Sequence, residues 1–325
     1  MRSIEICAGA GGQALGLEQA GFEHIALVEI DLAACFTLKM NRPKWNVIAG
    51  DLKTFSASEY IGTVDLLSGG VPCPPFSIAG KQLGIDDERD LFPEALRLVK
   101  ECNPEAVMLE NVRGLFERKF DMYRENIKQE FENLGYKCIW ELAHANHFGV
   151  PQQRTRTILI AMKEKYIKHF SWPLGVLAPP PTVGQLLLDE MASNGWDGAQ
   201  KWAKIANGIA PTLVGGSKKH GGADLGPTRA RMAWKKLGID GRSLADMPPE
   251  KGFEGNPKLT VSMAAMVQGF PPEWKIAGKK TPAYRQVGNA FPPPVAKAIG
   301  GSVYKALMIV KQQEAAQYEK TRSAV

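Results

Sequence analysis

Short apolar runs alternate with helical patterns over the first half of the chain. Seven runs rich in β-branched residues are expected to be strands: 3–7, 24–29, 45–49, 64–67, 106–110, 136–143 and 157–162. Several are almost continuously apolar, as in strands buried on both faces. Between them, apolar residues recur at helical spacing, as at Leu91, Ala95 and Leu98 and at Ile127 and Phe131. The pattern predicts an α/β fold, a doubly wound and mostly parallel sheet covered by helices on both sides.

The pattern changes after Trp172, where three consecutive prolines at 179–181 form a stiff connector. From 194 to 256 glycine is frequent, apolar runs are short, and tryptophans and lysines are interleaved. We expect a second, smaller, loop-rich domain over 181–279, with 1–180 and 280–325 forming the larger one. Helical periodicity returns at 293–308, and the polar residues 312–325 are expected to be frayed.

Composition is that of an ordinary globular protein: 325 residues, 44% hydrophobic and 23% charged. No apolar run approaches the roughly 18 residues of a membrane-spanning helix, and the amino terminus lacks the pattern of a secretory signal. Five cysteines without paired spacing argue against a disulfide framework and a structural zinc site. These features predict a cytoplasmic protein with no membrane partner and no metal.

The net charge of +6 is concentrated in one stretch. Residues 200–258 contain 11 basic and 5 acidic residues, whereas the rest of the chain has 29 of each. A localised basic excess is typical of a surface that binds a polyanion. On charge alone, a solvated basic face without a partner is an equally good interpretation.

The turn after the first expected strand is rich in glycine and is Ala8-Gly9-Ala10-Gly11-Gly12, before a helix expected at about 13–20. Glycines at such a turn let the backbone approach a ligand at the positive end of the helix. Glu29 ends the second strand and Asp51 the third, where carboxylates could bind ribose hydroxyls and an adenine amino group. Together these features favour a nucleoside pocket, and capping of helices by the two acids is the alternative.

Three prolines flank a single cysteine after the fourth expected strand, in Pro72-Cys73-Pro74-Pro75. Because Cys73 precedes a proline, its backbone is restricted to extended conformations. A cysteine held in this way at the end of a strand is a candidate nucleophile. An inert loop cysteine is the alternative.

An acid and two arginines could reach the same edge of the sheet. Glu110 and Asn111 end the fifth strand, and Arg154 and Arg156 precede the last. Nearby cations would favour the thiolate form of Cys73. The alternative is a capping glutamate and two surface arginines.

Taken together, these segments resemble the DNA (cytosine-5)-methyltransferases, of the type found in bacterial and phage restriction-modification systems. The resemblance extends in order from residue 3 to about 300, through 5–12, 69–77, 110–112, 152–156, 268–271 and 286–292. It implies a Rossmann-like catalytic domain at 1–180 and 280–325, a target-recognition domain at 181–279, and S-adenosyl-L-methionine as methyl donor.

The resemblance implies a covalent mechanism. Cys73 would add to carbon 6 of a cytosine flipped out of the duplex, and Glu110 would hold ring nitrogen 3. Arg154 and Arg156 would position the base and Glu110, and Asn111 would brace the loop that contains Cys73. Carbon 5 would then take the methyl group, and loss of its proton would expel Cys73.

The resemblance also assigns binding residues. Those for the cofactor are Ala8, Gly9, Gly11, Gly12, Glu29, Ile30, Asp51, Leu52, Pro72, Leu91, Asn289 and Ala290. Those for double-stranded DNA are Ser77, Lys81, Gln82, Arg89, Thr212, Leu213, Lys218, Lys219, Arg229 and Arg231. The expected state is a monomer, and a cognate restriction endonuclease could exist in the same cell without a stable complex.

The chain departs from the family pattern at three positions. Cys7 stands where an aromatic residue usually packs on the adenine, and Pro74 stands where glutamine is common. Val261 follows Thr260 where proline is usual, so the hinge into the catalytic domain could differ. Two alternatives stay open: an RNA cytosine methyltransferase of the same fold, and a catalytically inactive DNA-binding regulator.

Overall fold

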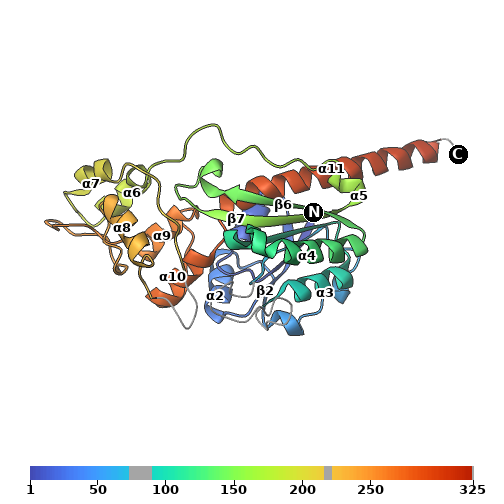
Figure 1. Cartoon of the computed structure of the whole chain (residues 1–325), viewed down its shortest axis with the longest axis horizontal. Coiled ribbons are helices and arrows are strands. Elements are labelled where there is room, and N and C mark those ends of the chain that lie inside the picture. Colours follow the sequence, from blue (N-terminus) through green and yellow to red (C-terminus); the bar gives the residue numbers. More distant parts are fainter. Residues whose placement is uncertain (73–89, 216–221, 324–325) are drawn as a thin grey trace.

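The computed structural model describes residues 1–72, 90–215 and 222–323, which contain one seven-stranded sheet in the order β3-β2-β1-β4-β5-β7-β6 (Figure 1). The strands are β1 Arg2–Ile6, β2 Glu23–Glu29, β3 Val47–Ala49, β4 Leu66–Gly70, β5 Ala106–Val112, β6 Tyr136–His144 and β7 Thr155–Lys163. All seven strands predicted from the sequence are confirmed, with ends that differ by three residues at most.

The first five strands of this order are parallel, whereas β7 is antiparallel to both of its neighbours. The reversal decides which residues meet at the edge of the sheet. Because β7 runs the other way, its beginning lies beside the carboxyl end of β5, and Arg156 pairs with Val112. In a wholly parallel sheet, the two arginines would lie at the opposite edge from Glu110.

Helices cover both faces of the sheet, as predicted. On one face, α3 (Phe92–Cys102) and α4 (Asp121–Asn133) pack over strand residues such as Ile6 and Val107. On the other face lie α1 (Gly12–Gln19), α2 (Leu32–Asn41) and α11 (Pro293–Ser323), over residues such as Leu27 and Met108. Short helical segments complete this part: η1 Leu52–Thr54, η2 Ser58–Tyr60, η3 Arg113–Phe116, η4 Arg118–Phe120, η5 Ala145–Phe148 and α5 Glu164–Ile167.

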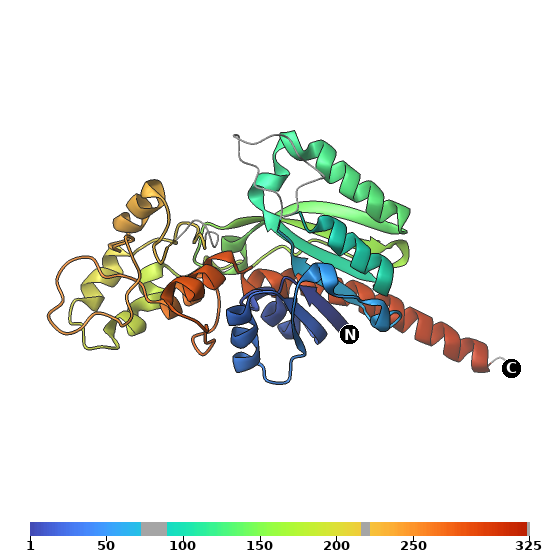
Figure 2. The same ribbon diagram turned by 90° about the horizontal axis from the view of Figure 1, so that it is seen from below.

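The expectation of a frayed end after residue 312 is wrong for the described residues, because α11 continues to Ser323 and extends past the sheet (Figures 1 and 2). Side chains from Lys311 to Ser323 are exposed, so packing does not hold this part. The segment instead extends a helix that the core has already nucleated, and Ala, Glu, Gln and Lys propagate a helix at little cost. Within the described ranges, no helix, α11 included, contains an apolar stretch long enough to cross a bilayer.

A second group of helices lies beside the sheet (Figure 2). It comprises α6 (Val183–Ala192), α7 (Ala199–Ile205), α8 (Thr228–Lys236) and α9 (Val261–Val267), joined by long loops. Its core includes Leu187, Trp202 and Trp234, and it continues into Tyr284 of α10 (Lys280–Asn289) and Leu15 of α1. The predicted boundary at 279 therefore falls just before a helix that packs in the core of this small unit.

Val261, where the family usually has proline, is the first residue of α9. Thr260 caps this helix, and its side chain accepts a hydrogen bond from the backbone N–H of Met263 at 3.2 Å. Proline is favoured at a first helical position because no intrahelical bond is lost there, but it is not required. The helix therefore begins normally without it.

Candidate active site and cofactor pocket

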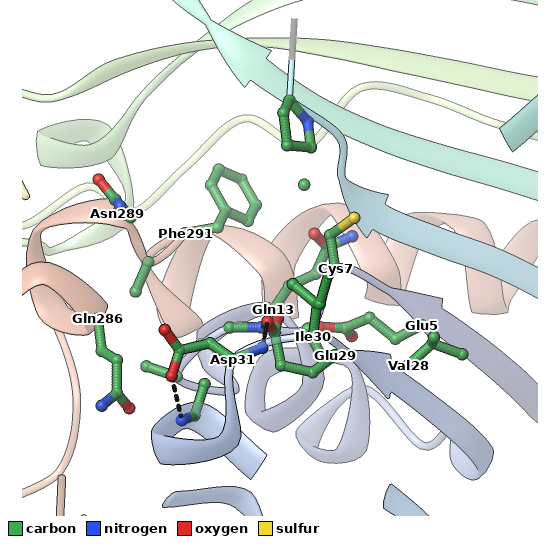
Figure 3. A pocket seen from close by; sticks show the side chains of 18 of the residues that line it. Glu5, Cys7, Gln13, Val28, Glu29, Ile30, Asp31, Gln286, Asn289 and Phe291 are labelled. Atoms are coloured by element: carbon green, nitrogen blue, oxygen red, sulfur yellow. Dashed lines mark hydrogen bonds between the residues drawn. The ribbon is translucent and has the colours of Figure 1, made fainter. Parts of the chain in front are cut away.

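A cavity of about 300 Å³ opens at the carboxyl ends of β1, β2, β3 and β4, facing α10 (Figure 3). Of the twelve residues predicted to bind the cofactor, eleven line it: Ala8, Gly9, Gly12, Glu29, Ile30, Asp51, Leu52, Pro72, Leu91, Asn289 and Ala290. Its size is at the lower end of the range for pockets that enclose small ligands.

Gly11 is the exception, and its role is in packing. It caps the start of α1 with φ 81°, and a Cβ there would lie 2.6 Å from Leu38 and 3.1 Å from Trp274. Gly12 has little space as well, since its Cβ would lie 2.1 Å from the carbonyl oxygen of Phe291. Gly9, at φ 55°, is the glycine of this turn that leaves open space toward the cavity.

Of the two acids predicted to bind the nucleoside, Asp51 caps the short helix η1, whereas α2 is capped by Asp31 and not by Glu29. The carboxylate of Glu29 accepts hydrogen bonds from the backbone N–H groups of Gly9 and Asp31, both at 2.7 Å. Asp51 accepts one from the N–H of Lys53 at 3.0 Å. Carboxylate oxygens accept more than one hydrogen bond, so both acids can cap a turn and still bind a ligand.

Cys7 lines the cavity where the family has an aromatic residue. Its backbone is in the left-handed region, with φ 53°. Burial raises the pKa of its thiol to about 12, and the carboxylates of Glu29, Asp51 and Glu5 add to the effect. This cysteine therefore stays protonated and does not compete as a nucleophile.

Sequence reasoning missed several lining residues. They are Glu5, Ala10, Gln13, Val28, Asp31, Ala34, Gly50, Gly70, Pro282, Arg285, Gln286 and Phe291, and Glu110 was predicted only as a catalytic group. Glu5 is 1% exposed, and its Oε2 atom has no hydrogen-bond partner in the described part of the chain. Burial holds the pKa of this carboxyl well above its usual range. The sequence signal that could have identified Glu5 is its position in the segment 5–12, just before the glycine-rich turn.

Glu110 lines the same cavity and forms an ion pair with Arg156. The Nε atom of Arg156 is 2.7 Å from Oε1 of Glu110, and both side chains are largely buried. Gly70 pairs with Glu110 across β4 and β5, and a Cβ there would lie 3.1 Å from the carboxylate. Burial lowers the pKa of Arg156, although Glu110 opposes this effect. The carboxyl group of Glu110, held by Arg156, therefore faces the cavity that the predicted cofactor residues line.

Arg154, predicted together with Arg156 to position the base and Glu110, is bonded to the backbone. Its guanidinium is 1% exposed and donates to the backbone carbonyls of Leu213 (2.9 Å), Gly288 (3.0 Å) and Ala290 (2.9 Å). Burial lowers the pKa of Arg154 well below its usual range. Its contacts are those of a residue that joins β7, the small unit and the end of α10.

The described residues on either side of 73–89 are hydrogen-bonded. Asn111 donates to the carbonyl of Val71 at 2.9 Å, the contact expected of a residue that braces this segment. The N–H of Leu91 donates to the carbonyl of Pro72 at 3.2 Å. Several predicted residues lie outside the described ranges: Cys73, Ser77, Lys81, Gln82, Arg89, Lys218 and Lys219.

Two of the predicted DNA contacts are anchors between the units. Leu213 is fully buried, and its N–H donates to the side chain of Gln152 at 2.9 Å, so it offers no surface to DNA. The Thr212 hydroxyl donates to the carbonyl of Gln153. On α8, Arg229 is exposed, whereas Arg231 is half-buried and donates to the Thr228 hydroxyl at 3.2 Å.

Comparisons with known proteins agree with the site. The family described as C-5 cytosine-specific DNA methylase matches residues 1–305. The Type II methyltransferase M.NgoMIV of Neisseria gonorrhoeae is 53% identical over 314 residues, which cover 94% of this chain and 97% of that one. M.NaeI of Lentzea aerocolonigenes is 54% identical over 310 residues, covering 94% and 75%. The crystal structure of S. pombe Dnmt2 methyltransferase, at 18% identity, has the same fold, with a TM-score of 0.64 over 96% of this chain and 99% of that one. The chain belongs to the C-5 cytosine-specific DNA methylase family.

Proposed function

We propose that the protein transfers the methyl group of S-adenosyl-L-methionine to carbon 5 of a cytosine flipped out of double-stranded DNA, through a covalent adduct with Cys73. One observation carries the proposal: Glu110, paired with Arg156, lines the same cavity as Gly9, Glu29 and the other nucleoside-type residues. A methyl donor and a target base can therefore meet in one space.

The residues of the cavity fit this cofactor. The turn at Gly9 leaves room for close approach of a ligand, and Glu29 and Asp51 offer acceptors for ribose hydroxyls and an adenine amino group. The apolar side chains of Ile30, Leu52 and Leu91 supply surfaces for the adenine ring in place of the missing aromatic residue. When bound, the cofactor supplies an electrophilic methyl group.

The catalytic residues have distinct tasks. Cys73, as thiolate, adds to carbon 6 of the cytosine, and the negative charge that develops on the ring is stabilised at nitrogen 3 by Glu110. Glu110 does this while holding or sharing a proton, and Arg156 fixes the orientation of its carboxyl group. After methylation, loss of the carbon 5 proton restores the double bond and releases Cys73. Arg154 acts as a positioning residue through the three backbone carbonyls that it binds.

The DNA substrate would lie between the sheet edge and the small unit, which we propose is the target-recognition domain at 181–279. Arg229 and Arg231 of α8, with the basic segment around them, would contact phosphates or bases. Affinity for duplex DNA should therefore fall steeply as salt rises. We propose that the enzyme acts as a monomer in the cytoplasm, and that it can serve beside a restriction endonuclease without a stable complex.

The test is capture by a mechanism-based substrate. Duplex DNA carrying 5-fluorocytosine cannot lose a proton from carbon 5, so the wild-type protein with S-adenosyl-L-methionine should form a covalent complex that survives denaturation. Cys73→Ala should form none, whereas Cys35→Ala should trap DNA as the wild type does, because Cys35 belongs to α2 and is buried in a cluster with Leu27. The target duplex is found first by sequencing methylated cytosines in DNA from cells that express the protein.

Two outcomes would overturn the proposal. Covalent capture by Cys73→Ala would remove the assigned nucleophile. Methylation of transfer RNA in preference to duplex DNA, measured with both acceptors in one competition assay, would replace the substrate class.

A further inference from the structure

The cofactor cavity is strongly acidic. Five carboxyl-bearing side chains line it, namely those of Glu5, Glu29, Asp31, Asp51 and Glu110. Among the described residues that line it, Arg285 is the one lysine or arginine. An anionic group of a bound ligand would therefore be repelled by the ionised carboxylates of the wall and attracted by Arg285.

Arg285 lies on the face of α10 that is turned to the cavity. Pro282, Gln286 and Asn289 share this face, and Figure 3 shows Gln286 and Asn289 across the pocket from Glu5 and Cys7. The Nε atom of Arg285 is buried and has no hydrogen-bond partner among the residues that the structure describes. This N–H is therefore a donor that the described residues leave unsatisfied.

The backbone at Arg285 is held in place from two sides. The side chain of Gln286 accepts from the Thr37 hydroxyl at 2.6 Å and donates to the Ala277 carbonyl at 2.8 Å. On the other side, Gly215 of the small unit packs so closely that a Cβ there would lie 2.5 Å from the Arg285 carbonyl oxygen. The guanidinium therefore projects from a fixed point of the cavity wall.

The charges of the proposed donor match this distribution. S-adenosyl-L-methionine carries two cationic groups, the sulfonium and the α-ammonium, and one anionic group, the α-carboxylate. The acidic side chains of Glu29, Asp31 and Asp51 suit the cations, and a guanidinium binds a carboxylate through two parallel hydrogen bonds. Arg156 is already engaged by Glu110, and Arg154 by three backbone carbonyls, so neither arginine is available to the carboxylate.

We propose that Arg285 binds the α-carboxylate of the amino-acid part of the methyl donor. This inference rests on the proposed function, because it assumes the donor, and it adds a binding residue to the pocket. Asn289, one helical turn further along α10, faces the same part of the cavity.

The experiment is calorimetric binding of two ligands to the purified protein. One is S-adenosylhomocysteine, which has the carboxylate, and the other is decarboxylated S-adenosylhomocysteine, which lacks it. Loss of a charge-assisted pair should weaken S-adenosylhomocysteine binding by roughly 10- to 100-fold in Arg285→Met, and leave the decarboxylated ligand unchanged. Arg285→Lys should restore part of the loss. Lys279→Met, which removes an exposed cation before the same helix, should have no effect on either ligand.

Several results would overturn the inference. An equal loss for both ligands in Arg285→Met would show that the residue only shapes the pocket. A loss of duplex affinity with unchanged binding of S-adenosylhomocysteine would assign Arg285 to DNA. If the variants do not fold, the wild type alone can still test the inference. Equal affinity of the wild type for the two ligands would show that the carboxylate is not bound, and would overturn the inference. Failure of the wild type to bind S-adenosylhomocysteine at all would instead reject the proposed function together with this inference.

Discussion

Arg156 and Glu110 face each other across two antiparallel strands, with Nε and Oε1 at 2.7 Å. Arg156 pairs in register with Val112, two residues beyond Glu110, so the sheet itself sets the distance between the two side chains. The exposed fractions of the side chains are 14% for Arg156 and 11% for Glu110. A buried pair of this kind orients a carboxyl group far better than an exposed one, because water screens it less.

The first prediction concerns this pair. Glu110→Gln should lower the methylation rate by about 10²- to 10⁴-fold, as for loss of a group that handles a proton. Arg156→Lys should lower it less, because lysine keeps the charge but not the geometry. The double variant should be no slower than Glu110→Gln alone, because the two residues act as a unit. Single-turnover methylation of a saturating duplex measures all three.

The matched control for this prediction lies at the other end of β5. Glu105 forms a similar ion pair with Lys163 at 3.2 Å, away from the cavity. Glu105→Gln should leave the methylation rate unchanged. If Glu105→Gln lost as much methylation rate as Glu110→Gln, the loss would come from disturbing an ion pair of the sheet and not from removing a catalytic group.

The second prediction concerns Arg154, which satisfies three backbone carbonyls in the interior. Arg154→Met should lower the free energy of unfolding by about 3 kcal/mol, because buried acceptors are left without donors. Arg231→Met, at a half-buried arginine that donates to the Thr228 hydroxyl on the surface of α8, should change it by less than about 0.5 kcal/mol. Urea denaturation of both variants measures these changes. An Arg154→Met protein as stable as the wild type would contradict the conclusion that Arg154 joins β7, the small unit and the end of α10.

The different tasks of Arg154 and Arg156 illustrate what sequence reasoning could not reach. The two residues stand in one motif and were given one role. Their partners separate them: Arg156 meets a strand neighbour, whereas Arg154 meets carbonyls that follow it by 59, 134 and 136 residues. Such long-range contacts leave no local pattern.

The predictable part of the site depends on local rules. Glycine at a strand-to-helix turn and acids at strand ends indicated the cofactor pocket, because those positions follow from strand direction alone. Arg285 was missed because nothing in the sequence of α10 indicates which face packs toward the sheet. The burial of Leu213 could not be predicted, because a motif position indicates that a residue matters and not whether it is exposed.

The third prediction compares two adjacent glycines of α11. A Cβ on Gly300 would lie 2.5 Å from Cδ2 of Leu17 in the buried contact with α1, whereas a Cβ on Gly301 would meet nothing within 4 Å. Gly300→Ala should destabilise the protein by about 1 to 3 kcal/mol through overpacking. Gly301→Ala should stabilise it by about 0.5 to 1 kcal/mol, because alanine favours a helix interior. Thermal denaturation gives the sign of each change in stability. Equal changes in the two variants would show that α11 does not contact α1 at Gly300.

The last prediction is a pH dependence at Glu5. Its carboxyl is buried, and its pKa is raised well above the usual value of 4.5, chiefly by burial, with Glu29 adding to the effect. As pH rises above 4.5, the unfolded chain releases this proton while the folded protein keeps it, so wild-type stability falls until the raised pKa is reached. Glutamine mimics the protonated form and has no such loss. The advantage of Glu5→Gln over the wild type, measured by urea denaturation of the ligand-free proteins, should therefore be small at pH 4.5 and grow by about 1.4 kcal/mol for each pH unit inside that window. An advantage that stays constant from pH 4.5 to pH 8 would show that Glu5 titrates in the folded protein as it does in the unfolded chain.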